Sequence, residues 1–258
     1  MKISSLLLTA AAFVLTSCLE VKSVLSINKD GTATIEETAM LGAQLQAMMA
    51  QGGGGGGADS MKDLVPDKAK AEERAKQLGE GVTLKSHEDV KTPDGRGGVK
   101  VTYAVADIRN LKYTPFGAKS KEGKEEKPAT FTLDGSTLTM TLPVDKKSDK
   151  PKSDKPAVPK EQMMAQMAMM KPMFAGMRMT AEIKAPGGIA SSDATHLTGD
   201  TMTVLDMQID KLMDKPENFM GFMESAEKNL SMAEAAEKFK GVEGIKIEGK
   251  GTVKMELK

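Results

Sequence analysis

Short aliphatic runs separated by turn residues form the main hydrophobic pattern of this chain. Residues 19–27 and 32–40 are two such runs joined by Asp30-Gly31, which predicts a β-hairpin. We expect residues 245–247 and 252–257 to form a terminal hairpin in the same way. Further strands are predicted at residues 82–85, 99–105, 129–133, 137–142, 179–184 and 201–207.

Helical patterns lie between these strands. Residues 68–78 are rich in Ala, Glu, Lys and Arg, and Gly79 suits the position just after the helix. Strands that arrive in adjacent pairs, with helices elsewhere, predict an α+β fold. We expect antiparallel hairpins forming one or two sheets, with helices packed on one face. The other helices are predicted at residues 41–51, 161–177, 208–213, 217–226 and 231–239.

Two segments are too poor in apolar residues to be part of a core. Residues 52–57 are six consecutive glycines, which favour a flexible connection. Residues 145–160 repeat Ser-Asp-Lys-Pro and predict a disordered linker. This linker separates an N-terminal α+β region, residues 18–144, from a C-terminal α+β region, residues 161–258, that contains a Met-rich helix. The pattern leaves open whether these are two domains or one interrupted sheet.

The first residues have the pattern of an export signal. Lys2 precedes a ten-residue apolar run that ends at Leu15, too short to span a hydrocarbon core about 30 Å thick. Leu15, Thr16, Ser17 and Cys18 follow in a pattern that resembles the bacterial lipobox. The resemblance implies that residues 1–17 are a signal peptide, that the Cys18 sulfur receives a diacylglyceryl group, and that cleavage before Cys18 is followed by N-acylation with a fatty acid such as palmitate.

Composition supports this interpretation of the amino terminus. Cys18 is the single cysteine, so no disulfide is available to the exported domain. Lys and Arg total 36, as do Asp and Glu, and this balance gives no indication of nucleic-acid binding. We therefore expect a bacterial envelope protein attached to a membrane through the lipid on Cys18. Leu19, rather than Asp, favours the outer membrane, on its periplasmic or its surface face.

A cluster of methionines is the most distinctive side-chain pattern. Thioethers at M-x-x-M spacing are soft ligands suited to Cu(I). At 100° per residue, however, five apolar side chains share one helical face, which is more typical of a core or of an adaptable hydrophobic contact surface. We favour the contact surface and expect no bound metal. The face consists of Met163, Met167, Met170, Phe174 and Met177, with Met164, Met169 and Met173 beside it.

No motif in the sequence indicates catalysis. His87 and His196 lack metal-ligand spacing, and no G-x-S-x-G segment provides a serine nucleophile. We therefore expect no catalytic residues and no cofactor. The favoured hypothesis is a binding or structural module whose partner is a lipid or an envelope protein. The alternatives are an envelope hydrolase without a recognisable motif and a periplasmic Cu(I)-binding protein.

Several turn segments together resemble a known lipoprotein family. Lys29-Asp30-Gly31-Thr32 joins the first two predicted strands, and Ala185-Pro186-Gly187-Gly188-Ile189 follows a later strand. With Gly199-Asp200 and the strand that starts at Thr201, this arrangement is similar to LppM-type bacterial lipoproteins. The resemblance implies an α+β envelope domain with lipid or glycolipid contacts and no known catalysis.

Overall fold

The computed structural model describes residues 19–50, 65–117, 127–143, 164, 167–169, 171–227 and 230–258. Their strands form two sheets accompanied by short helices, which confirms the predicted α+β class. The flexible connection predicted at residues 52–57 and the linker predicted at residues 145–160 lie outside these described residues.

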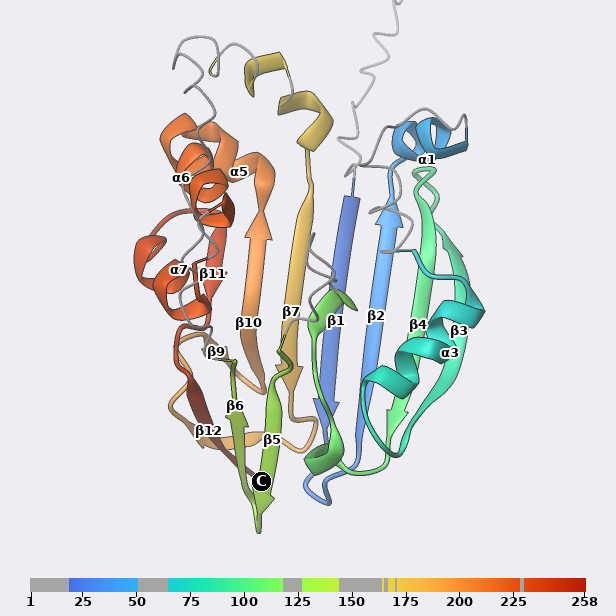
Figure 1. Cartoon of the computed structure of the whole chain (residues 1–258), viewed down its shortest axis with the longest axis vertical. Coiled ribbons are helices and arrows are strands. Elements are labelled where there is room, and N and C mark those ends of the chain that lie inside the picture. The colour runs from blue at the N-terminus through green and yellow to red at the C-terminus, as the bar shows by residue number, and fades with distance from the viewer. Residues whose placement is uncertain are drawn as a thin grey trace, which may run out of the picture.

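The larger sheet forms the frame of the molecule (Figure 1). Neighbouring pairs are antiparallel except that β1 and β7 run parallel. A short strand, β9 (Leu197–Thr198), pairs with β10 beside the main path. The strand order is β11 (Ile245–Ile247), β10 (Thr201–Gln208), β7 (Arg178–Lys184), β1 (Leu19–Ile27), β2 (Ala33–Leu41), β4 (Gly97–Val105) and β3 (Val82–Lys91).

A smaller sheet crosses the lower half of the first sheet in Figure 1. Its order is β5 (Thr130–Asp134), β6 (Thr137–Thr141), β12 (Thr252–Leu257) and β8 (Ile189–Ser192). β1 pairs with β7, and β6 pairs with β12. Regions 18–144 and 161–258 therefore both contribute strands to both sheets.

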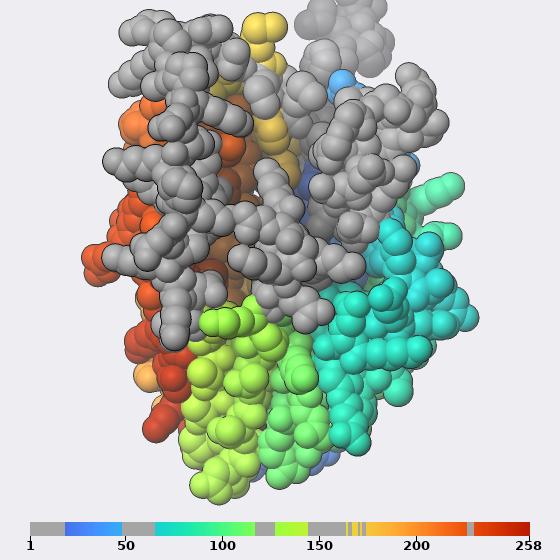
Figure 2. Space-filling view, viewed as in Figure 1, coloured from blue at the N-terminus to red at the C-terminus, as the bar shows by residue number. Residues whose placement is uncertain are grey.

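Helices lie at the side and at the upper end of the larger sheet (Figure 1). α3 (Lys68–Gln77) packs along β3, and Figure 2 shows it beside the second sheet across the lower part of the same face. The remaining helices are α1 (Ala43–Ala50), α5 (Ile209–Asp214), α6 (Pro216–Glu227) and α7 (Met232–Lys238), with 3-10 turns η1 (Ile108–Asn110), η2 (Pro115–Gly117) and η3 (Lys171–Phe174).

The main core lies between the two sheets. β4 alternates strictly between buried and half-buried residues, as expected when one face of a strand packs inward. Leu25 and Ile35 from the larger sheet are fully buried in one cluster with Leu138 and Met255 from the smaller. A second cluster joins α5, β11 and the end of α7 to β10.

Local turn chemistry explains the elements that the sequence predicts correctly. In the confirmed β1–β2 hairpin, Gly31 has φ 87°, and the Thr32 amide donates a hydrogen bond to Asp30 Oδ1 over 2.9 Å. α3 starts at Asp67, whose carboxylate accepts from the Lys70 amide over 2.8 Å.

The predicted terminal hairpin is wrong. β11 pairs with β10 in the larger sheet, whereas β12 pairs with β6 and β8 in the smaller one. The chain crosses between the sheets at Glu248, whose fully buried carboxylate accepts hydrogen bonds from the Thr195 amide, the Thr195 hydroxyl and the Lys250 amide. Burial of each strand against a different sheet outweighs the local tendency of adjacent strands to pair.

Two predicted boundaries also differ from the structure. β3 continues to Lys91 instead of ending at residue 85, because its polar second half pairs with β4 at the edge of the sheet. The helix expected over residues 161–177 does not reach Met177: its described part is helical at residues 164 and 167–169, then becomes 3-10 at η3. Pro172 has no amide hydrogen to continue an α-helix, and Gly176 turns with φ 65°.

Candidate functional site

The amino-terminal end of β1 is the part of the fold nearest the predicted lipidation site. The lipobox residues Leu15, Thr16, Ser17 and Cys18 lie outside the described residues. Leu19, the next residue, already belongs to β1.

β1 is held from both sides at this end. Leu19 is paired with Leu41 of β2, and Glu20 is paired with Arg178 of β7. Leu19 and Leu41 also share a small buried cluster with Val21 and Leu45, the latter from α1. The chain therefore enters a fixed strand immediately after Cys18.

The Met-rich segment lies at the same end, directly before β7. Met167 is buried in the cluster that contains Leu212, and Phe174 and Met177 pack against that cluster. The rings of Phe174 and Phe219 have centroids 6.5 Å apart, which links η3 to α6. Of the predicted contact face, Met163 and Met170 lie outside the described residues.

Two methionines of this segment point outward instead. Met164 is 43% exposed and Met169 is 80% exposed. The segment therefore has an inner set, Met167, Phe174 and Met177, that packs on α5 and β10, and an outer pair that faces solvent.

Charged side chains around this end of the sheet form ion pairs. Arg96 contacts Glu20 at 3.0 Å, and Lys171 contacts Asp214 at 2.6 Å. Arg178 donates two hydrogen bonds, of 2.8 and 2.9 Å, to the Asp206 carboxylate, and these bonds raise the pKa of the Arg178 guanidinium.

A polar cluster lies inside the fold, between α3 and the larger sheet. Arg74 donates to both carboxylate oxygens of Glu37 at 2.9 and 2.6 Å, and to the Thr114 carbonyl at 2.6 Å. Ser23 and the Tyr113 hydroxyl lie 2.9 Å apart, and burial raises the pKa of Tyr113. The contacts of Arg74 fix α3 on the sheet, and the buried Tyr103 hydroxyl beside this ion pair has no hydrogen-bond partner. Nothing in the sequence marks this pairing, because Glu37 and Arg74 are distant in the chain.

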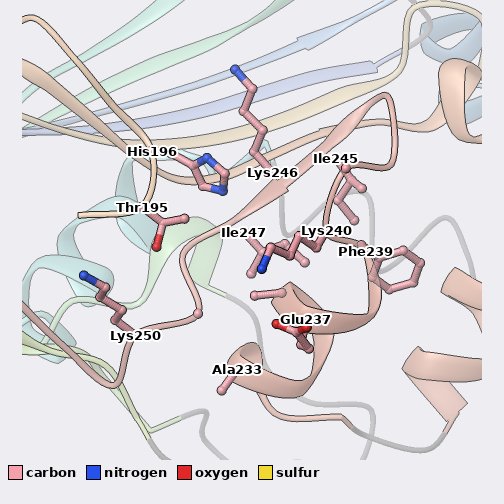
Figure 3. A pocket seen from close by; sticks show the side chains of 13 residues that line it. Thr195, His196, Ala233, Glu237, Phe239, Lys240, Ile245, Lys246, Ile247 and Lys250 are labelled. Carbon is pink, nitrogen blue, oxygen red and sulfur yellow. The ribbon is translucent and has the colours of Figure 1, made fainter. Parts of the chain in front are cut away.

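A pocket of about 300 Å³ lies between α7 and β11. Figure 3 shows Glu237 and Lys240 directed into the space below Ile247, while Lys246 points away on the other side of β11. Lys250 is engaged elsewhere, since its amine donates to the Asp193 carbonyl. The lining thus combines one carboxylate with lysine, histidine and threonine side chains and with apolar residues. Beside this pocket, Ser231 and Glu234 form a capping box at the start of α7.

The two histidines lie in different parts of the fold. His87 Nε2 lies 2.9 Å from the Pro66 carbonyl, and His196 lies at the rim of the α7–β11 pocket. Among the described residues, no group of three or more His, Cys, Asp or Glu side chains is arranged to hold a metal ion. Within the same residues, no helix is long and apolar enough to cross a membrane.

Comparisons with known proteins give a weak structural likeness to solved structures. No protein-family model matches the chain, and no curated protein matches its sequence. Among solved structures, the fold is similar to the folded domain of LppM from Mycobacterium tuberculosis, with a TM-score of 0.30 and 9% identity. That alignment covers 72% of this chain and 81% of the LppM domain.

Proposed function

We propose that this chain is a bacterial envelope lipoprotein, anchored by acyl groups on Cys18, that acts as a non-enzymatic binding or structural module. The observation that carries the proposal is the position of the single cysteine, three residues after the end of an apolar run of export-signal length and directly before the first strand. Two or three acyl chains, each contributing about 0.8 kcal/mol per buried CH₂, hold a protein firmly on a bilayer. Leu19 in the second mature position supports the outer membrane as its location.

A substitution at Cys18 tests the anchor. In a bacterial host fed an alkyne analogue of palmitate, we expect Cys18→Ala to abolish fatty-acid labelling and to move the protein from the detergent phase to the aqueous phase of Triton X-114. Ser17→Ala is the matched control: it keeps a small residue before the cleavage site, so labelling and partitioning should stay as in the wild type. A Cys18→Ala variant that partitions with the detergent would contradict the lipoprotein assignment.

The described polar groups support a module without catalysis. The Arg74 guanidinium and the Glu37 carboxylate of the interior are engaged with each other. The Tyr103 hydroxyl is buried without a hydrogen-bond partner, and burial raises the pKa of Tyr103, which disfavours a phenolate nucleophile. In the α7–β11 pocket, the Thr195 hydroxyl donates to Glu248 over 2.7 Å, but the Glu248 carboxylate is fully buried and also anchors two backbone amides. That carboxylate holds the chain crossing and is poorly placed to accept a proton during turnover.

A further inference from the structure

The lipid attachment fixes which end of the molecule meets the membrane. The Cα atoms of Cys18 and Leu19 are about 3.8 Å apart across a trans peptide bond. Leu19 pairs with Leu41 of β2, and the next residue, Glu20, pairs with Arg178 of β7, so no free linker separates the acylated residue from the sheet. This end of the sheet must therefore lie at the headgroup layer whenever the acyl chains are inserted.

Strand register shows which other segments share that end. Glu20 near the start of β1 pairs with Arg178 at the start of β7, and Arg178 pairs with Gln208 at the end of β10. The Met-rich segment leads directly into β7, and α5 and α6 follow directly after β10. Figure 1 shows α1, α5 and α6 gathered at this upper end of the sheet.

Exposed apolar side chains concentrate in the same segments. Four large hydrophobic side chains are exposed among the described residues, and three of them belong to this end: Met164, Met169 and, on α6, Met223, which is 47% exposed. The fourth, Leu197, is 37% exposed and lies on β9. β9 pairs with the start of β10, where Thr201 faces Lys184 at the far end of β7. Leu197 therefore marks the opposite end of the sheet.

The exposed methionines are held outward by their neighbours. Met167 anchors its segment in the cluster with Leu212, and Lys171 is paired with Asp214 of α5. α6 is joined to η3 through the contact of Phe174 with Phe219. These inner contacts join the Met-rich segment to α6, and each of the two segments carries an exposed methionine, Met169 and Met223. Unbranched methionine side chains adapt to irregular apolar surroundings, and the boundary between the headgroups and the acyl chains of a bilayer is such an environment.

We propose that this end of the sheet docks on the lipid bilayer itself, with Met164, Met169 and Met223 inserted into the headgroup–acyl boundary. The bilayer is the expected binding partner because of the lipid anchor: a lipid on Cys18 brings the bilayer against this end of the sheet before any other partner can reach it. The inference rests on the proposed acylation of Cys18. Docking would restrict the tilt of the domain and direct the Leu197 end away from the membrane.

Site-directed spin labelling tests the orientation on the acylated protein. Because Cys18 is acylated, a cysteine introduced by Met164→Cys, Met169→Cys or Met223→Cys is the single reactive thiol. Leu197→Cys is the matched control, an exposed apolar position at the other end. Each labelled protein is reconstituted into vesicles of phosphatidylethanolamine and phosphatidylglycerol, and spin relaxation is measured with oxygen, which dissolves in lipid, and with a water-soluble nickel complex.

We expect labels at positions 164, 169 and 223 to relax faster with oxygen than with nickel, and the label at position 197 to show the reverse order. Nickel accessibility at the three methionine positions equal to that at position 197 would overturn the docking surface. Exclusion of both reagents at these positions would also overturn it, since that result indicates a protein contact. Failure of the lipid anchor is recognised separately: the chain without an added cysteine would then react with the spin label at Cys18 and would not remain with the vesicles.

Discussion

The ion pair between Arg74 and Glu37 is expected to contribute strongly to stability, and Arg74→Met tests this. Methionine keeps much of the apolar stem of arginine but removes the three hydrogen bonds that the guanidinium makes to Glu37 and to the Thr114 carbonyl. The two side chains are only 12% and 15% exposed, so the Glu37 carboxylate would stay largely buried without its partner.

The size of the effect follows from this burial. Removing one partner of a buried ion pair costs about 3–5 kcal/mol. Glu37 keeps some access to water, so we expect a loss at the lower end, about 3 kcal/mol. For a domain of this size that corresponds to a decrease in Tm of roughly 6–12 °C. The free energy of unfolding is measured by urea titration, followed by circular dichroism, on the chain from residue 18 with Cys18→Ser.

Two further variants separate this pair from general effects of losing an arginine. Arg109→Met removes an exposed ion pair with Asp107, in which the Arg109 side chain is 61% exposed, and should cost much less stability than Arg74→Met because solvent screens that pair. The double variant Arg74→Met, Glu37→Leu removes both buried charges and should recover part of the lost stability. The reasoning is refuted if Arg74→Met costs no more than Arg109→Met, or if the double variant is less stable than Arg74→Met alone.

Two more predictions concern a turn and the response to acid. Gly79→Ala places a Cβ atom 2.2 Å from a backbone carbonyl oxygen, at φ 129°, and should cost about 2–3 kcal/mol in the free energy of unfolding measured with urea. Gly135→Ala is the control: at φ 58°, with nothing within 4 Å of the added Cβ atom, it should cost about 1 kcal/mol. Equal losses would show that the close approach at Gly79 is unimportant. Hydrogen bonds from Ser136 and Thr137 lower the pKa of Glu256 below its ordinary 4.5, so the folded state favours the ionised carboxylate. The contribution of this carboxylate to stability is present above pH 4.5 and is lost as the pH falls through the lowered pKa. Acid unfolding of Glu256→Gln should therefore depend less steeply on pH below about 4.5 than that of the wild type, and identical slopes would contradict the assignment.

The sequence by itself determines the local elements of this protein. Asp30-Gly31 specifies the β1–β2 turn because glycine readily adopts the required positive φ, and the Asp30 carboxylate binds the Thr32 amide two residues later. The sequence also supplies the whole case for the anchor at Cys18, since the lipobox pattern depends on residue types in consecutive positions. Both features involve neighbours in the chain, so a pattern of residues is sufficient to indicate them.

Tertiary structure alone decides which distant segments meet. Two contacts join residues far apart in the chain: the parallel pairing of β1 with β7 and the buried ion pair of Glu37 with Arg74. A third feature separates neighbours in the chain, since β11 and β12 belong to different sheets. Such contacts depend on how much apolar surface a whole arrangement removes from water, which no local pattern records. For the same reason, the sequence predicts a Met-rich apolar face, but only the fold shows that Met167 is buried in a cluster and that Met169 is exposed, at the end of the sheet next to the predicted lipidation site.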